Sequence, residues 1–86
     1  EDYKILKPGL IVTSARVEIE DLENVLGVRI SHIDDEFDTI GGLVMARSGS
    51  VPEKGEVIHI TDDIIAEILE ATPRTIKQIK ITYTAK

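Results

Sequence analysis

Two adjacent glycines, Gly41 and Gly42, open an apolar run and directly follow a burst of carboxylates. A glycine in a helix interior costs about 1 kcal/mol relative to alanine, so a pair of them needs a structural reason. A residue without a Cβ lets the backbone approach another segment closely. The pair therefore predicts a helix start that packs tightly on a neighbour, or a cation site formed with the acids before it.

The carboxylates before the glycines are candidate ligands for a divalent cation: Asp34, Asp35, Glu36 and Asp38. Mg²⁺ and Ca²⁺ take several oxygen ligands from loops. The EF-hand pattern is absent. The simpler interpretation is a solvated loop in which Asp38 or Thr39 caps the following helix. The glycine pair also matches no phosphate-loop or dinucleotide fingerprint.

Hydrophobic periodicity divides the chain into a short strand, two helices and a β-rich second half. Apolar residues with helical spacing lie before Gly27 and again before Gly49. The period predicts strands at 10–13, 56–60 and 75–84, and helices at 19–26 and 40–46. Residues 64–71 carry a helical stripe, and residues 1–8 read as an N-terminal linker ahead of a domain at 9–86. The pattern indicates a small single α+β domain.

Composition excludes several classes of function. The 86 residues carry a formal net charge of −6, which disfavours nucleic acid and anionic membrane surfaces. There is no cysteine, so disulfides and thiolate chemistry are excluded. No apolar stretch approaches the ~20 residues that span a bilayer. The chain begins with Glu1, which indicates a piece of a longer protein.

No residue pattern indicates catalysis. His32 and His59 lack partners at metal-ligand spacing, and the serines lack a nucleophile-elbow context. Arg74, Lys77 and Lys80 form a basic strip on the last predicted strand, without the aromatic residues that stack on bases. We therefore expect a protein that is not an enzyme, and a strip that is an exposed or edge-protecting strand face.

The chain resembles the transporter-associated domain, or CorC/HlyC domain, over nearly its whole length. The most specific match is residues 36–44, Glu-Phe-Asp-Thr-Ile-Gly-Gly-Leu-Val, which is similar to the family's acid–aromatic–D-T-hydrophobic-G-G pattern. Residues 19–27 are similar to its "I-x-D-L-N-x-x-L-G" helix, and residues 49–56, with Pro52 and Gly55, to its "G-x-I-P-x-x-G-E" loop. The chain departs from the family at Ala66 and at Thr72-Pro73, where an aromatic residue and an Asp-Gly turn are common.

The resemblance implies a fold in which two short helices pack on a mostly antiparallel sheet, of the FAD-binding/transporter-associated type. It also implies that residues 64–71 are a strand rather than a helix. The motif residues then have structural roles: Phe37 as a core anchor, Asp38 or Thr39 as a cap, and Gly41 and Gly42 as close-packing positions. No cofactor is implied.

The function implied by the resemblance is regulatory. Relatives of this kind follow a transmembrane region and a pair of CBS domains in magnesium and cobalt efflux or hemolysin-like proteins. We therefore expect a non-catalytic cytoplasmic domain that modulates ion transport. Its partners would be the CBS pair and membrane region of its own parent chain, with a homodimer possible, no nucleic acid, and no entry of this segment into the membrane. The alternatives are direct cation sensing by residues 34–38, or a small-ligand module that binds nucleotides.

Overall fold

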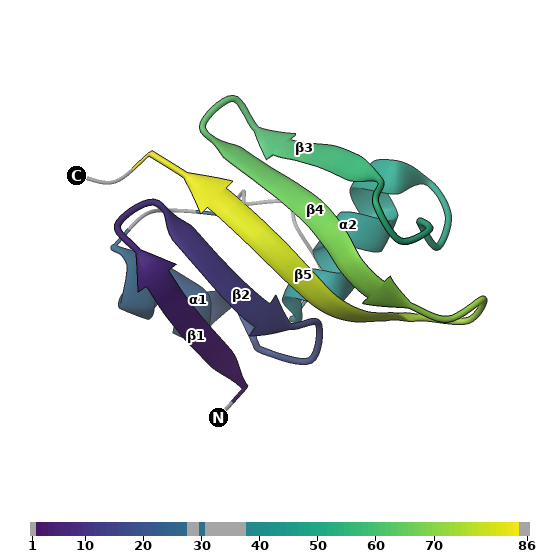
Figure 1. Ribbon diagram of the computed structural model, residues 1–86, viewed down its shortest axis with the longest axis horizontal. Coiled ribbons are helices and arrows are strands. Elements are labelled where there is room, and N and C mark those ends of the chain that lie inside the picture. The colour runs from purple at the N-terminus through teal and green to yellow at the C-terminus, as the bar shows by residue number, and fades with distance from the viewer. Residues whose placement is uncertain (1, 28–29, 31–37, 85–86) are drawn as a thin grey trace.

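The computed structural model describes residues 2–27, 30 and 38–84, and its centre is a five-stranded sheet. The sheet has the order β1-β2-β5-β4-β3, and all four strand pairings are antiparallel. Helices α1 and α2 lie on one face of it (Figure 1). The elements are β1 (Tyr3–Lys7), β2 (Leu10–Ser14), α1 (Ile19–Leu26), α2 (Ile40–Ser48), β3 (Val57–Thr61), β4 (Ile64–Ala71) and β5 (Ile76–Tyr83). The predicted α+β class and antiparallel arrangement are confirmed.

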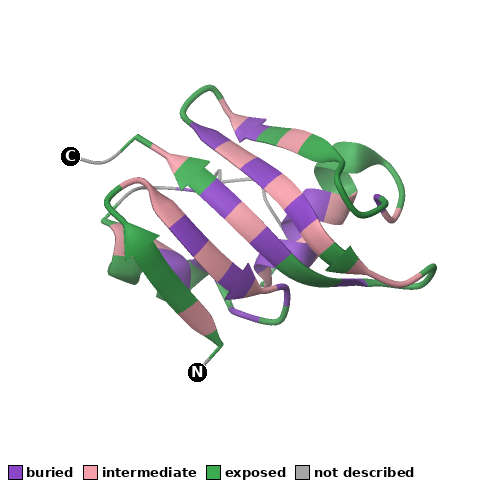
Figure 2. Ribbon diagram, in the orientation of Figure 1, coloured by how far each residue is buried: buried purple, intermediate pink, exposed green. Residues whose placement is uncertain are grey.

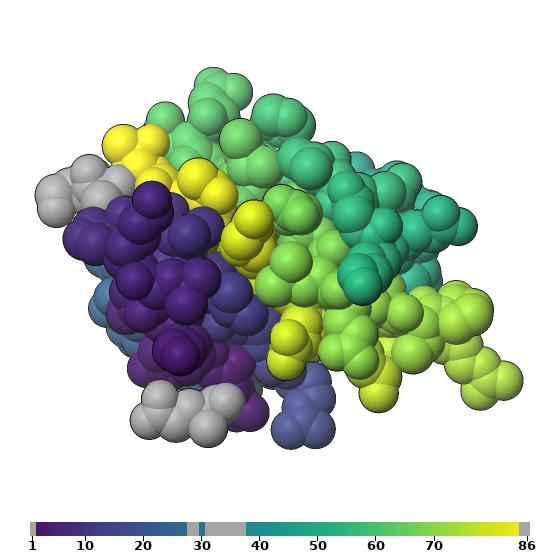
Figure 3. All heavy atoms as spheres, viewed as in Figure 1, coloured from purple at the N-terminus to yellow at the C-terminus, as the bar shows by residue number. Residues whose placement is uncertain are grey.

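Alternation along the strands separates a core face from an open face. Burial bands cross the central strands in Figure 2, and the side chains of Ile64, Ala66 and Ile68 in β4 are all buried. The core is aliphatic, and β2, β5 and both helices also contribute residues to it. On the open face, which Figure 3 presents to the viewer, the strand registers align Val12, Lys80, Glu67 and Val57 in one row. Lys80 and Glu67 form an ion pair of 3.1 Å in this row.

Residues 64–71 form the strand that the family resemblance implied, and the helical interpretation of their stripe is wrong. Because β4 lies between β3 and β5, its outward side chains Ile65 and Leu69 are half-buried too. A strand that is apolar on both faces loses clean alternation and can imitate a helical stripe.

The sheet extends toward the N-terminus of the chain further than expected. Tyr3–Lys7, within the stretch interpreted as a linker, is strand β1 and pairs with β2. β1 is an edge strand whose last four residues are exposed, so it has little apolar periodicity for sequence reasoning to detect.

The start of α2 is clamped against the segment that joins β2 to α1. The amide of Gly41 donates to the carbonyl of Ala15 at 2.9 Å, and the amide of Ile40 donates to the carbonyl of Val17 at 3.0 Å. A Cβ built on Gly41 would lie 2.7 Å from the Cβ of Ala15 and 2.9 Å from its carbonyl oxygen. The close-packing role predicted for Gly41 is therefore confirmed, and Ala15 is the residue it packs against.

The loop before β3 is held to the start of the β3–β4 hairpin by backbone bonds. Pro52 is buried, and Gly55 has a φ of 92°, in the left-handed region that favours glycine. The Gly55 amide donates to the carbonyl of Ile68 at 2.8 Å, and the Ile68 amide donates to the carbonyl of Glu56 at 3.0 Å. Two motif residues of the sequence thus hold the loop on β4.

We expect Gly41→Ala to destabilise the fold by about 1–3 kcal/mol, because the new methyl group overlaps Ala15. Urea unfolding of the purified chain measures the change. Ala15→Gly in the Gly41→Ala background should recover only part of the loss, since it removes the Cβ contact but leaves the contact with the carbonyl oxygen. A Gly41→Ala variant that is as stable as the parent chain would contradict the inferred close contact between Gly41 and Ala15.

Candidate functional site

Three of the four acidic residues proposed as cation ligands lie outside the described residues: Asp34, Asp35 and Glu36. The proposed core anchor Phe37 and His32 also lie outside them. Asp38 is exposed, and its carbonyl accepts a hydrogen bond from the Ile19 amide at 2.8 Å. Among the residues that the structure describes, no group of three His, Cys, Asp or Glu side chains is arranged to hold a metal ion.

Thr39 is the N-cap of α2. Its backbone is extended, and its hydroxyl oxygen accepts a hydrogen bond from the Gly42 amide at 3.2 Å. Of the two candidates, Asp38 and Thr39, the structure selects Thr39. An isolated β-bridge between Thr39 and Glu18 joins the starts of the two helices. Asp38 and Thr39, the polar motif residues that the structure describes, therefore contribute hydrogen bonds that hold the fold together.

The histidine on the β3 edge has no metal-site geometry. His59 is exposed, while Ile58 is half-buried and Ile60 is buried, as the alternating pattern predicted. β5 is a central strand of the sheet, so the expectation that its cations protect a sheet edge is wrong. Lys80 pairs with Glu67 on the open face, Lys77 is exposed near the start of β5, and Arg74 lies in the turn before β5 rather than on the strand.

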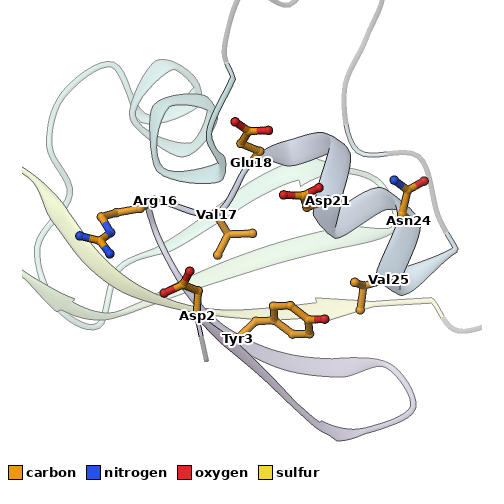
Figure 4. A pocket seen from close by; sticks show the side chains of 8 residues that line it. All are labelled: Asp2, Tyr3, Arg16, Val17, Glu18, Asp21, Asn24 and Val25. Carbon is orange, nitrogen blue, oxygen red and sulfur yellow. The ribbon is translucent and has the colours of Figure 1, made fainter.

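An acidic groove lies between β1, α1 and the β2–α1 connection. Its volume is about 640 Å³. Carboxylates come from Asp2, Glu18 and Asp21, and apolar surface comes from Tyr3 and from the two valines of this region. In Figure 4 the Tyr3 ring lies between β1 and α1, with its hydroxyl end toward Val25. The two valines are Val17 and Val25, and the remaining lining residues are Arg16 and Asn24.

The groove combines negative charge with an apolar surface. Such a surface suits a lysine or arginine side chain, because the aliphatic stem packs on apolar groups while the cationic head meets carboxylates. Arg16 is the cation of the groove, and Figure 4 shows its side chain extending away from Asp21 and Asn24. Three carboxylates therefore dominate the face presented to a partner.

Sequence reasoning missed this groove. The sequence patterns give Asp21 no functional role, and Asp2 and Tyr3 fall within the stretch interpreted as a linker. The pairing of Tyr3 with Thr13 brings β1 beside the core, which no local pattern predicts. Because β1 has little apolar periodicity, the sequence offers no signal that would place Asp2 and Tyr3 in a groove.

Comparison with known proteins identifies a family. Residues 5–85 match the model described as the transporter associated domain, CorC_HlyC. A hemolysin C homolog of Rickettsia massiliae is 47% identical over 81 residues, which cover 94% of this chain and 27% of that protein. Hemolysin C of Rickettsia prowazekii is 46% identical over 80 residues, which cover 93% of this chain and 26% of that protein. The chain thus spans about a quarter of the length of these relatives.

Solved structures share the fold over nearly the whole chain. One such structure is a protein region from Neisseria meningitidis, described as associated with a putative Mg²⁺ and Co²⁺ transporter. It is 25% identical to this chain, with a TM-score of 0.83, and the match covers 98% of this chain and 100% of that one. A domain of a Porphyromonas gingivalis CBS domain protein is 21% identical, with a TM-score of 0.82 and coverage of 96% and 98%. A Xylella fastidiosa hemolysin domain in complex with Mg²⁺ and Mn²⁺ is 19% identical, with a TM-score of 0.78 and coverage of 98% and 99%.

We expect Thr39→Ala to lower the free energy of unfolding by about 1 kcal/mol, since the Gly42 amide loses its side-chain acceptor. Thr39→Ser keeps the hydroxyl and serves as the matched control, with a loss well under half as large. Chemical denaturation measures both variants. Equal losses in the two would show that the methyl group, and not the cap, stabilises this position.

Proposed function

Because this chain belongs to the transporter-associated (CorC_HlyC) domain family, we propose that it is a non-catalytic regulatory domain of a membrane ion-transport protein. The family is described by its association with transporters and not by a catalytic activity. No helix among the described residues has the length and apolar character needed to cross a membrane. We place the domain on the cytoplasmic side, where it acts by docking.

The observation that carries this proposal is the acidic groove beside α1. Its three carboxylates surround apolar surface from Tyr3 and Val25, which favours a basic segment with aliphatic stems over a free metal ion. The occupant we propose is a basic segment of the parent chain, in its CBS-domain pair or its membrane region. A neighbour of the same fold comes from a CBS domain protein, which supports that arrangement.

A second copy of the chain is a further partner that we propose for the sheet edges. β1 and β3 are the two edge strands of the sheet. Their outward backbone groups are available to another strand, and Ile5, Leu6 and Val57 are about half exposed, at 47%, 49% and 54%. A homodimer formed by edge pairing would leave the groove beside α1 free for the basic segment.

Cation sensing is the second candidate function. The carboxylates at 34–38 precede the capped start of α2, and the Xylella domain of the same fold was solved with Mg²⁺ and Mn²⁺. A cation bound at residues 34–38 would act on transport through the start of α2, which follows these residues in the chain. A nucleotide-binding module is the third alternative, and a flat thermal-shift screen with flavins and adenine nucleotides would remove it.

We expect reversal of the groove charge to alter ion transport by the full-length parent protein. Glu18→Lys with Asp21→Lys should reproduce the effect of deleting residues 1–86 on Mg²⁺ or Co²⁺ flux, because a basic segment can no longer dock. Flux into or out of proteoliposomes is the measurement, at matched protein level. The control is Asp62→Lys, an exposed acid in the β3–β4 turn, and it should leave the flux unchanged. Deletion without any effect on flux would overturn the regulatory proposal.

Metal titration separates docking from cation sensing. If the domain acts by docking alone, backbone amide NMR shifts at residues 34–38 stay constant below millimolar Mg²⁺, Co²⁺ or Ca²⁺. Saturable shifts confined to those residues would establish sensing instead. Asp34→Asn with Asp35→Asn should then abolish the shifts, whereas Asp62→Asn should not.

A further inference from the structure

A second cavity lies at the end of the sheet where β2 stops and β5 begins. Its volume is about 360 Å³. Ser14 and Gln78 face each other in the β2–β5 register, and Glu70 of β4 pairs with Gln78 on the other side. The Ala15 amide donates to the carbonyl of Lys77 at 3.0 Å, which fixes the segment after β2 beside the start of β5. The cavity is therefore framed by hydrogen-bonded backbone.

Two cations, Arg16 and Lys77, line this cavity, and the one acid of its lining, Glu70, makes no ion pair with either of them. Arg16 follows Ala15 directly, so the backbone bond between Ala15 and Lys77 brings the guanidinium-bearing and ammonium-bearing segments together. Both side chains are exposed, and within the described part of the chain neither makes an ion pair. The register shifts of β4 on either side of Glu70 also leave Lys77 without a cross-strand partner in the ladder. Two neighbouring like charges repel, and an anion between them removes that repulsion.

Neutral donors complete the lining. The Ser14 hydroxyl oxygen accepts from the Arg16 amide at 3.3 Å, which leaves its own proton available to donate. The amide side chain of Gln78 makes no hydrogen bond among the described residues. The residues that carry guanidinium, ammonium, hydroxyl and amide donors thus line one cavity, from β2, the turn after it and β5. Glu70 is the acid of the lining, and it lowers the affinity for any anion.

We propose that the cavity between Arg16 and Lys77 binds a phosphoryl group. A guanidinium offers a planar fork to two oxygens of a phosphate, and an ammonium and a hydroxyl can meet the others. The volume lies near the lower end of the ~300–1,000 Å³ typical of small-molecule sites, so the cavity admits a phosphate ester and not only the free ion. The site shares Arg16 with the acidic groove, but it requires only an anion between Arg16 and Lys77 and holds whether or not the groove docks a basic segment.

The test is a backbone amide NMR titration of the chain at constant ionic strength. Inorganic phosphate, glycerol phosphate and adenosine monophosphate are the three probes. We expect saturable shifts at residues 14–16 and 75–78 in the millimolar range. Tighter binding of glycerol phosphate would identify a lipid headgroup as the source, tighter binding of adenosine monophosphate a nucleotide, and equal binding the phosphoryl group alone. No saturable shift with any probe would overturn the proposal.

Matched variants separate the site from a general effect of charge. Arg16→Ala and Lys77→Ala should each weaken binding about tenfold, the loss expected for one charge-assisted contact. Glu70→Gln should tighten binding roughly two- to threefold, because a nearby negative charge is removed. Lys7→Ala removes the same charge at the opposite end of β2 and should leave the affinity unchanged. If Lys7→Ala weakens binding as much as Arg16→Ala, the cavity is not a site.

Discussion

The contact between the first turn of α2 and the β2–α1 connection governs the arrangement of this domain. A helix leaves its first four amides without internal partners. Here the Ile40 and Gly41 amides donate to the carbonyls of Val17 and Ala15, and the Gly42 amide donates to Thr39. The backbone of another segment can reach those amides only because position 41 carries no Cβ. The glycine thus allows hydrogen bonds that a side chain would block.

Both candidate sites depend on the segment held by this contact. Residues 14–18 run between the cavity at the sheet end, which includes Ser14, and the acidic groove, which includes Glu18. Ala15 and Val17 are buried, whereas the alternate residues Arg16 and Glu18 are exposed. A rigid core on one side of the segment therefore presents charged groups on the other. The close packing of Gly41 on Ala15 therefore also sets where Arg16 and Glu18 lie.

The sequence allowed most elements to be predicted, and the exceptions have physical causes. Both helices, Gly27 and Gly49 after them, and strands β2, β3 and β5 follow from periodicity and turn residues. β4 needed the family resemblance, since a strand that is apolar on both faces has no clean alternation. β1 is not predicted from the sequence, because this exposed edge strand contains lysines and lacks an apolar pattern. Gly41 was expected to pack closely, but its partner Ala15 is distant in sequence, and no local rule supplies such a pair. The same limit hid the groove and the central position of β5 in the sheet.

Arg16 links the two proposed sites, since it lines both cavities. When its guanidinium lies near the groove, its positive charge partly neutralises the negative charge of the groove carboxylates. A phosphoryl group that holds Arg16 at the sheet end would remove this positive charge from the groove and raise the affinity of the groove for a basic segment. Linkage requires the reverse effect to be equal in free energy: a basic segment in the groove repels Arg16 toward the phosphoryl cavity and strengthens binding there. The coupling is short-ranged, because exposed charges are screened beyond about 8 Å at physiological salt. One arginine, held beside the contact between Gly41 and Ala15, would thus be sufficient to connect the two proposed sites.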